Sequence, residues 1–251
     1  MHAIILSAGR GSRLLPLTTD LPKCLLPVGL SSVLSLQLDT LFRHGIETAT
    51  VVTGFNAHLV EAEIAARQAG PKVETLYNPF YHVADNLASC WMARGAMTQD
   101  FLLINGDTLF SPPLLEKVLM ALAKDITVTI DQKGHYDGDD MKVSLEGAHL
   151  TAIGKTLLPQ QTNGESIGML RFMNDGPKIF RNELDRLMRL EEGTKSWFLS
   201  AIHGLAQSGQ RIDTTNIKGS TWAELDTPED YEICRKLFGN SEMARKRFSA
   251  I

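Results

Sequence analysis

The residues of this sequence with the clearest chemical potential lie in its first 23 positions. Two glycines, Gly9 and Gly11, follow a short apolar run that ends at Leu6, and two cations, Arg13 and Lys23, come soon after. A glycine-rich turn lets the backbone approach a nucleotide and aim its N–H groups at phosphates. Cationic side chains beside such a turn would bind the same phosphates. This segment therefore predicts a binding site for a phosphorylated ligand.

The spacing of the glycines excludes two common nucleotide-binding motifs. The segment lacks the G-x-x-x-x-G-K-[ST] spacing of a P-loop and the third glycine of the dinucleotide fingerprint. Two glycines alone would favour an ordinary turn. The whole string Leu6-Ser7-Ala8-Gly9-Arg10-Gly11-Ser12-Arg13-Leu14, followed by Pro22-Lys23, resembles a longer signature. It matches at every position the L-x-A-G-x-G-[ST]-R-[LM] and P-K signature of the sugar-nucleotide pyrophosphorylase-like nucleotidyltransferases.

Resemblance to this family implies a Rossmann-like nucleotidyltransferase fold and a magnesium-dependent reaction. A phosphate or phosphonate oxygen of an acceptor would attack the α-phosphorus of an NTP, and pyrophosphate would leave. Arg13 would stabilise the β- and γ-phosphates, and Lys23 would draw the acceptor toward the α-phosphorus. The loop residues expected to lie against the nucleotide are Leu6, Ala8, Gly9, Gly11 and Ser12.

The family also implies an aspartate after the fourth strand. Here the predicted strand Phe101–Asn105 is followed by Gly106 and Asp107. Magnesium prefers hard oxygen ligands and keeps several waters, so one or two carboxylates suffice to hold it. We therefore predict Asp107 as a metal ligand and Gly106 as a nucleotide contact.

A second carboxylate segment lies late in the chain. The string Trp222-Ala223-Glu224-Leu225-Asp226-Thr227-Pro228-Glu229-Asp230 resembles the family's W-x-[ED]-[IVL]-D-[ST]-x-[ED]-[DE]. Two carboxylates placed two apart on a strand point to one face. The resemblance implies that Asp226 binds the metal, and Glu224 is a further candidate ligand. Asp226 or Thr227 is also expected to cap the helix that follows.

One segment bears on the choice of nucleotide. The string Asp85-Asn86-Leu87-Ala88-Ser89 resembles the N-x-x-S of the phosphocholine and aminoethylphosphonate cytidylyltransferase group, where this loop lies against the base. The resemblance implies base contacts from Asn86 and Ser89 and favours CTP. Capping of the following helix by Asp85 or Asn86 explains the same residues equally well.

Three further segments resemble acceptor-binding pieces of that group: Asp139 to Val143, Gly154-Lys155, and Gly164 to Gly168. They imply acceptor contacts from Lys142, Lys155 and Glu165, since an acceptor phosphate or phosphonate needs cationic partners. A solvated acidic turn is the alternative for 136–140.

Trp197 is the last acceptor candidate. Relatives bind a trimethylammonium group through aromatic rings, by cation–π attraction, and show acidic residues after the aromatic. Here Ser196-Trp197-Phe198-Leu199-Ser200 keeps the aromatic residue and lacks the acids, which argues against a choline or ethanolamine acceptor. Packing of Trp197 and Phe198 in the core is the alternative.

Regular elements must position these residues. Up to residue 131 strands alternate with helices, which predicts a mostly parallel sheet with helices on both faces and ligands at the carboxyl ends of its strands. The predicted strands are Ala3–Leu6, Thr48–Thr53, Val73–Tyr77, Phe101–Asn105 and Ile126–Asp131. The predicted helices are Val33–Phe42, which Gly45 should end, His58–Ala69, Ala88–Ala96 and Pro112–Ala123.

The second part of the chain has a different rhythm. Its predicted strands are Met141–Leu145, Leu150–Ile153, Ile167–Phe172 and Thr221–Leu225. Its predicted helices are Lys178–Leu190, Trp197–Ser208 and Pro228–Leu237, with a surface helix or tail over Met243–Ile251. We expect a single domain over 1–251, with a nucleotide-binding half (1–131) and an acceptor-binding half (132–240) that supplies the second metal ligand.

The bulk composition fits this interpretation. The chain has 251 residues, of which 43% are hydrophobic and 22% charged, as is typical of a globular α/β domain. A net charge of −4 disfavours a nucleic-acid partner. Three distant cysteines indicate reduced thiols, and no apolar run is long enough for a signal peptide or a membrane span. The sequence thus predicts a cytoplasmic protein without nucleic-acid or membrane partners.

The function expected from these residues is transfer of CMP from CTP to a small phosphorylated or phosphonate acceptor, with Mg²⁺ as cofactor. One alternative is a sugar-1-phosphate nucleotidylyltransferase that uses UTP, GTP or dTTP. A second is an inactive nucleotide-sensing relative. Such relatives tend to lose the lysine or the metal aspartate, whereas Lys23, Asp107 and Asp226 are all present here.

Overall fold

The strand β1 (His2–Ser7) lies inside the central sheet, parallel to β4 (Thr48–Thr53) on one side and to β6 (Phe101–Asn105) on the other. Its side chains alternate between two buried clusters, with Ile4 in one and Ala3 and Ile5 in the other. A strand that is apolar on both faces needs cover on both faces. The computed structural model describes residues 1–239 and shows that cover.

The central sheet has nine strands in the order β5-β4-β1-β6-β11-β8-β12-β10-β9. The remaining members are β5 (Lys72–Tyr77), β11 (Gly164–Phe172), β8 (Ile126–Asp131), β12 (Asp213–Asn216), β10 (His149–Gly154) and β9 (Lys142–Glu146). β11 and β10 run in one direction, and the other seven of these nine described strands run in the opposite direction. The predicted mostly parallel sheet is confirmed in this sense. Because β11 lies between β6 and β8, the two predicted halves share one sheet.

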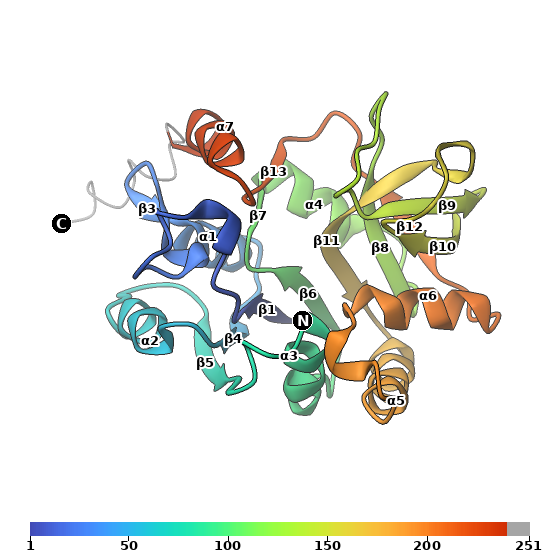
Figure 1. Ribbon diagram of the computed structural model, residues 1–251, viewed down its shortest axis with the longest axis horizontal. Coiled ribbons are helices and arrows are strands. Elements are labelled where there is room, and N and C mark those ends of the chain that lie inside the picture. The colour runs from blue at the N-terminus through green and yellow to red at the C-terminus, as the bar shows by residue number, and fades with distance from the viewer. Residues whose placement is uncertain (240–251) are drawn as a thin grey trace.

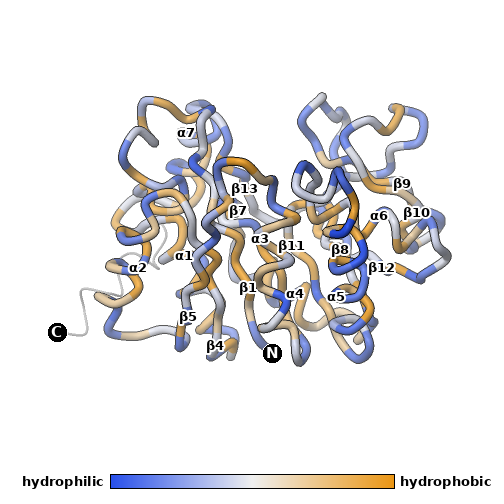
Figure 2. Tube along the Cα trace, turned by 60° about the horizontal axis from the view of Figure 1, so that its bottom comes forward, coloured by the Kyte–Doolittle hydropathy of each residue, from blue (hydrophilic) through white to orange (hydrophobic). Residues whose placement is uncertain are grey.

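Helices cover both faces of this sheet (Figure 1). The helices α3 (Asn86–Met92), α5 (Gly176–Leu187) and α6 (Leu199–Gln207) contribute to the cluster that contains Ile4. The helices α1 (Val33–Arg43), α2 (Ala57–Ala65) and α4 (Pro112–Met120) contribute to the other. Figure 2 shows hydrophobic stretches through the middle of the molecule and hydrophilic ones mostly at its outside. Gly45 has a φ of +78° directly after the cap of α1, as the sequence predicts.

A small second sheet brings the late carboxylates to the main one. β7 (Thr108–Phe110) pairs antiparallel with β13 (Trp222–Glu224), and a third buried cluster joins both strands to α7 (Pro228–Phe238). The predicted strand Thr221–Leu225 therefore exists, but it lies outside the central sheet. A third pair is β2 (Pro27–Val28) with β3 (Ser31–Ser32).

Several boundaries differ from those predicted. The predicted helix Ala88–Ala96 consists of α3 and a 3-10 turn, η3 (Ala93–Ala96), and α6 begins two residues after Trp197. The sequence does not predict β7 or β12. β7 has only three residues and β12 only four (Asp213–Asn216), which is too short for an apolar pattern to be recognised. The other 3-10 turns are η1 (Ser12–Leu14), η2 (Lys23–Leu25), η4 (Pro159–Gln161) and η5 (Gly193–Lys195).

The prediction for Met243–Ile251 lies outside the described residues. Within residues 1–239 no helix is long and apolar enough to cross a membrane.

The cap of α7 is Thr227, which leaves the neighbouring Asp226 free for other contacts. The Thr227 hydroxyl accepts from the backbone N–H of Asp230, and the Asp230 carboxylate accepts from the backbone N–H groups of Thr227 and Asp226. This capping box holds the backbone of the turn that carries Asp226.

We expect Thr227→Ala to lower the free energy of unfolding by about 1 kcal/mol, because it leaves helix N–H groups without an acceptor. Ser111→Ala is the matched control, since Ser111 occupies the same position before α4 and makes no side-chain capping bond. Urea denaturation of the three proteins measures the difference. An equal loss in both variants would show that the capping box contributes nothing.

Candidate active site

The predicted glycine loop lies at the carboxyl end of β1, beside the carboxyl end of β6. Leu6 is in register with Asn105, and the Leu6 carbonyl accepts from the Gly106 N–H at 2.9 Å. A Cβ on Gly106 would lie 2.3 Å from the Ser7 hydroxyl, so only glycine permits this close approach of the two strand ends. The glycine loop and Asp107 therefore share one edge of the sheet, where parallel α/β sheets bind ligands.

Gly11 explains how the loop positions Lys23. Its φ is +73°, a conformation that favours glycine, and a Cβ there would lie 3.0 Å from the side-chain stem of Lys23. The buried Thr18 hydroxyl donates to the Gly11 carbonyl at 2.7 Å and closes the segment between them. The aliphatic part of Lys23 thus packs on the glycine loop, and its ammonium points toward the strand ends.

Asp107 and Asp226 are brought together by the small sheet. Glu224 pairs with Thr108 across the two strands, and the backbone N–H of Leu225 donates to the Asp107 carbonyl at 3.0 Å. This pairing places two residues that are far apart in sequence on either side of one ammonium group. The two predicted metal ligands are therefore close to each other, as the resemblance implies.

The Lys23 ammonium lies 2.6 Å from Asp107 Oδ2 and 2.5 Å from Asp226 Oδ1. The side chains of all three residues are less than a quarter exposed, at 16%, 17% and 24%. Burial alone would lower the pKa of Lys23, but the two carboxylates outweigh it and raise that pKa. Burial likewise opposes ionisation of Asp226, and Lys23 outweighs it and lowers the pKa of that carboxyl. Lys23 and Asp226 are therefore both charged at neutral pH.

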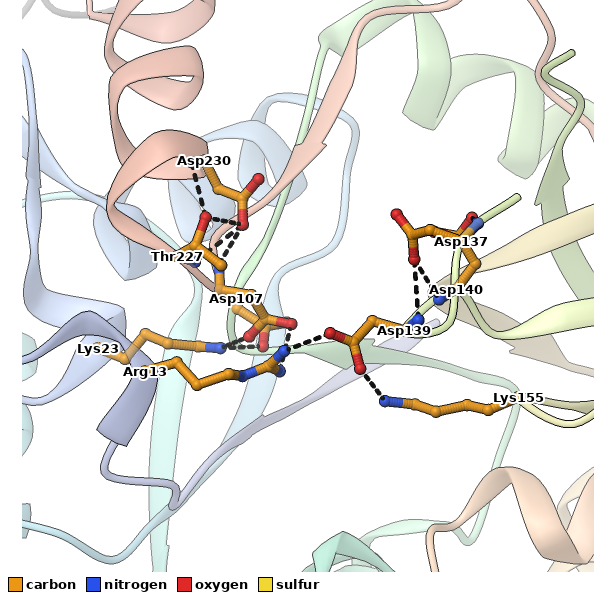
Figure 3. A network of polar contacts seen from close by, with 10 residues as sticks. Arg13, Lys23, Asp107, Asp137, Asp139, Asp140, Lys155, Thr227 and Asp230 are labelled. Carbon is orange, nitrogen blue, oxygen red and sulfur yellow. Dashed lines mark hydrogen bonds and ion pairs between the residues drawn. The ribbon is translucent and has the colours of Figure 1, made fainter. Parts of the chain in front are cut away.

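Arg13 connects this group of charges to Asp139, in the segment that follows β8. One of its terminal nitrogens donates to Asp226 at 2.8 Å, and the other donates to Asp139 at 3.1 Å. Asp139 in turn contacts the Lys155 ammonium at 3.5 Å, and Lys155 lies over the Trp197 ring, 4.9 Å from its centroid. Figure 3 shows Asp139 between Arg13 and Lys155. Of the predicted acceptor residues, Lys155 and Trp197 thus belong to this network.

Lys142 and Glu165 have other partners. The buried Lys142 ammonium donates to the backbone carbonyl of Lys155 at 2.9 Å. Glu165 is buried on β11 and contacts the Lys133 ammonium at 2.9 Å. Burial raises the pKa of Glu165 to about 7, against the opposing effect of Lys133. These contacts hold the segments around 133–155 in place, so any role for the two side chains in acceptor binding stays a prediction.

The predicted base-contact residues also have protein partners. Asn86 Oδ1 accepts from the backbone N–H of Phe198 at 2.8 Å, just before α6. Asn86 therefore caps a different helix from the one it begins. The buried Ser89 hydroxyl accepts from the amide of Asn78 at 2.9 Å. Contact of either residue with a base remains a prediction.

The carboxylates fit a divalent metal ion through oxygens that lack protein partners. Asp107 Oδ1 is buried without a hydrogen bond, although Oδ2 of the same group contacts Lys23. Desolvation of the Glu224 carboxyl and the negative charges of Asp107 and Asp226 raise its pKa to about 8. Within residues 1–239 no three acidic, histidine or cysteine side chains form a ready group of ligands. Magnesium bound by two carboxylates, waters and substrate phosphates needs no such group.

Sequence analysis does not predict the contact between Asp139 and Arg13. The two residues are 126 positions apart, and the segment around Asp139 is equally compatible with a solvated turn. The signal that the sequence does offer is that Asp139 follows the predicted strand Ile126–Asp131. The carboxyl end of that strand lies at the same edge of the sheet as the carboxyl end of β1, which the glycine loop follows.

The fold and this network define a Rossmann-like α/β protein with a glycine loop, a lysine and paired carboxylates at the carboxyl edge of its mostly parallel sheet. The chain belongs to the nucleotidyl transferase family, whose sequence model matches residues 2–138, more than half of the chain. The family predicted from the glycine loop is thereby confirmed.

Individual relatives are more distant. The chain is 26% identical over 238 residues to CMP-5'-(3-aminopropyl)phosphonate synthase of Streptomyces rubellomurinus, an alignment that covers 92% of this chain and 37% of that protein. It spans little more than a third of that relative's length. A shorter alignment, 43% identical over 67 residues, covers 27% of this chain and 28% of N-acetylmuramate alpha-1-phosphate uridylyltransferase of Caulobacter vibrioides.

Solved structures show the same fold. The inositol-1-phosphate CTP transferase of T. maritima superposes with a TM-score of 0.78 at 19% sequence identity, over 95% of this chain and 96% of that one. The Rossmann-like nucleotidyltransferase fold expected from the sequence is confirmed by this similarity.

Proposed function

We propose that this protein is a magnesium-dependent cytidylyltransferase that transfers CMP from CTP to a small phosphorylated or phosphonate acceptor and releases pyrophosphate. The observation that carries the proposal is the position of Lys23 between Asp107 and Asp226 at the edge of the glycine loop. Such a reaction asks nothing covalent of the protein. It requires that two mutually repelling anions be oriented and their charge neutralised.

Each charged group has a role in this reaction. The backbone around Gly9 and Gly11 lies against the nucleotide, and Arg13 contacts the β- and γ-phosphates. Lys23 stabilises the charge that builds up where the acceptor oxygen meets the α-phosphorus. Asp107 and Asp226, with Glu224 beside them, would hold Mg²⁺, which would supply positive charge beside the phosphates and the leaving group. Lys155 is the cationic partner for the acceptor's phosphate or phosphonate.

The choice of CTP rests on similarity. The segment from Asp85 to Ser89 resembles cytidylyltransferases, and two of the proteins similar to this chain are by name a CMP-phosphonate synthase and a CTP transferase. The name of the first relative also favours a phosphonate among the possible acceptors.

Sugar-1-phosphate nucleotidylyl transfer is a second candidate, because the short alignment of highest identity described above is to a uridylyltransferase. The nucleotide-sensing alternative is disfavoured by the ion pairs that join Lys23 to Asp107 and Asp226, since a site without chemistry has no need of them.

We expect CTP to support faster turnover than UTP, GTP or dTTP. A site that reads a base leaves buried polar groups unpaired against the wrong base and can discriminate by several orders of magnitude. Pyrophosphate release, measured with the four nucleotides against phospho-amines, phosphonates and sugar 1-phosphates, tests both halves of the proposal. Faster turnover with another NTP would show that CTP is not the preferred substrate, but it would leave the proposed reaction class intact. No release with any pair would refute the transferase.

Asp107→Ala should reduce turnover by about a hundredfold or more, equivalent to about 3 kcal/mol of barrier, while the melting temperature stays close to that of the wild type. Asp107 contacts Leu225 only through its backbone carbonyl, so the strand pairing survives the substitution. Asp107→Asn keeps the shape of the side chain but removes its charge, and it should lose as much turnover as Asp107→Ala. A near-wild-type rate in saturating Mg²⁺ would remove Asp107 from the site.

Lys23→Ala should lower kcat strongly with a modest change in nucleotide affinity, because its charge acts mainly on the transition state. Lys23→Arg should not restore the rate, since a planar fork replaces a compact point charge. Lys195→Ala is the control, a lysine with a 71% exposed side chain whose ion pair with Glu192 is 4.0 Å long. Calorimetric titration with NTP beside steady-state kinetics separates the outcomes. A loss confined to NTP affinity would place Lys23 on the triphosphate instead.

A further inference from the structure

Six charged side chains form one continuous chain of contacts in which anions and cations alternate. In order they are Asp107, Lys23, Asp226, Arg13, Asp139 and Lys155. The first four lie around the glycine loop and the small sheet, and the last two lie in the segments that follow β8 and β10 (Figure 3). Every cation that the proposed reaction needs is therefore already in contact with a carboxylate of the protein.

Asp139 differs from the other two carboxylates of this chain in its exposure. Its side chain is 74% exposed, compared with 17% for Asp107 and 24% for Asp226. Its two oxygens have different partners: Oδ2 accepts from Arg13 at 3.1 Å and Oδ1 contacts Lys155 at 3.5 Å. One carboxylate thus bridges a cation of each half of the protein.

The carboxylate of Asp139 does not shape its own loop. The Asp137 side chain accepts from the backbone N–H groups of Asp139 and Asp140, and the Asp140 carboxylate accepts from the Asp137 N–H and from Lys133. These contacts fix the turn through its other residues. The Asp139 carboxylate itself contacts Arg13 and Lys155.

We propose that Asp139 is a displaceable substitute for substrate phosphate groups: in the substrate-free protein its carboxylate contacts Arg13 and Lys155, the two cations to which phosphate-type anions of the nucleotide and the acceptor bind. This inference rests on the proposed function, from which Arg13 and Lys155 take their role as phosphate partners. Exposed ion pairs contribute little free energy, so an incoming anion displaces Asp139 readily. A phosphate oxygen then forms stronger, charge-assisted bonds with the same cations.

The displaced carboxylate has a consequence for product release. While Arg13 holds the phosphates that leave as pyrophosphate, Asp139 remains nearby as a competing partner for Arg13, as it does for Lys155 on the acceptor side. It therefore weakens binding of pyrophosphate and speeds its departure. Asp139 is a positioning residue in this scheme, since it acts on the anion only through the two cations.

The test is binding of inorganic pyrophosphate in the absence of metal, by calorimetry with EDTA present. Asp139→Asn should bind pyrophosphate about three- to tenfold more tightly than the wild type, the range that the loss of two exposed ion pairs allows. Glu232→Gln is the matched control, because it also removes one exposed carboxylate in contact with an arginine, at 3.2 Å on α7, and should leave the affinity unchanged. Asp139→Ala serves as a second variant, and thermal melting checks the fold of each.

A second measurement separates a positioning role from a structural one. In steady-state turnover, pyrophosphate should inhibit Asp139→Asn more strongly than wild type by a similar factor. Equal pyrophosphate affinity in wild type and Asp139→Asn would overturn the inference, as would an equal gain in Glu232→Gln or no measurable binding by any protein at millimolar pyrophosphate. The calorimetry needs no turnover, so failure of the transferase assay with tighter binding by Asp139→Asn would refute the proposed function and leave this anion position standing.

Discussion

The contact of the Lys23 ammonium group with two carboxylates is the interaction on which the candidate site depends. Lys23 comes from the segment after β1, Asp107 from the end of β6, and Asp226 from the turn between β13 and α7. Partly buried ion pairs offset the cost of desolvation only when the geometry is good, and replacing them with apolar residues often stabilises a protein. Stability alone therefore does not account for three charges at this edge of the sheet.

Much of the fold serves to bring those three segments together. The close approach of Gly106 to Leu6 aligns the ends of β6 and β1, and Gly11 leaves room for the stem of Lys23. The small sheet of β7 and β13 then carries Asp226 across from a distant part of the sequence. The capping box at Thr227 makes Asp226 the last residue before α7 without using its carboxylate as the cap. The carboxylate is thereby available to Lys23 and Arg13.

The sequence predicts the parts of the site whose constraints are local. Gly11 with its positive φ, the Lys23 stem packed against it, and Asp107 after a buried strand each lie in one short continuous segment, and they lie where the motifs indicate. The pairing of β13 with β7 depends on a partner more than a hundred residues away and has no local pattern. Lys142 shows the same limit of local patterns. Its short polar motif resembles one that binds an acceptor, whereas in the fold its ammonium donates to the backbone carbonyl of Lys155. Asn86 gives a second example. Its side-chain oxygen accepts from the backbone N–H of Phe198, just before α6 and 112 residues further along the chain, so no local pattern predicts the contact.

The alternation of charge also constrains what can bind. A divalent cation alone would approach Asp107 and Asp226 against the repulsion of Lys23, which already contacts both. An anion alone would approach Arg13 and Lys23 against the repulsion of the carboxylates that hold them. A ligand that carries both charges meets neither obstacle, because its cation can take the carboxylates while its phosphates take the freed lysine and arginine. The site is therefore better matched to a metal–nucleotide complex than to either component by itself.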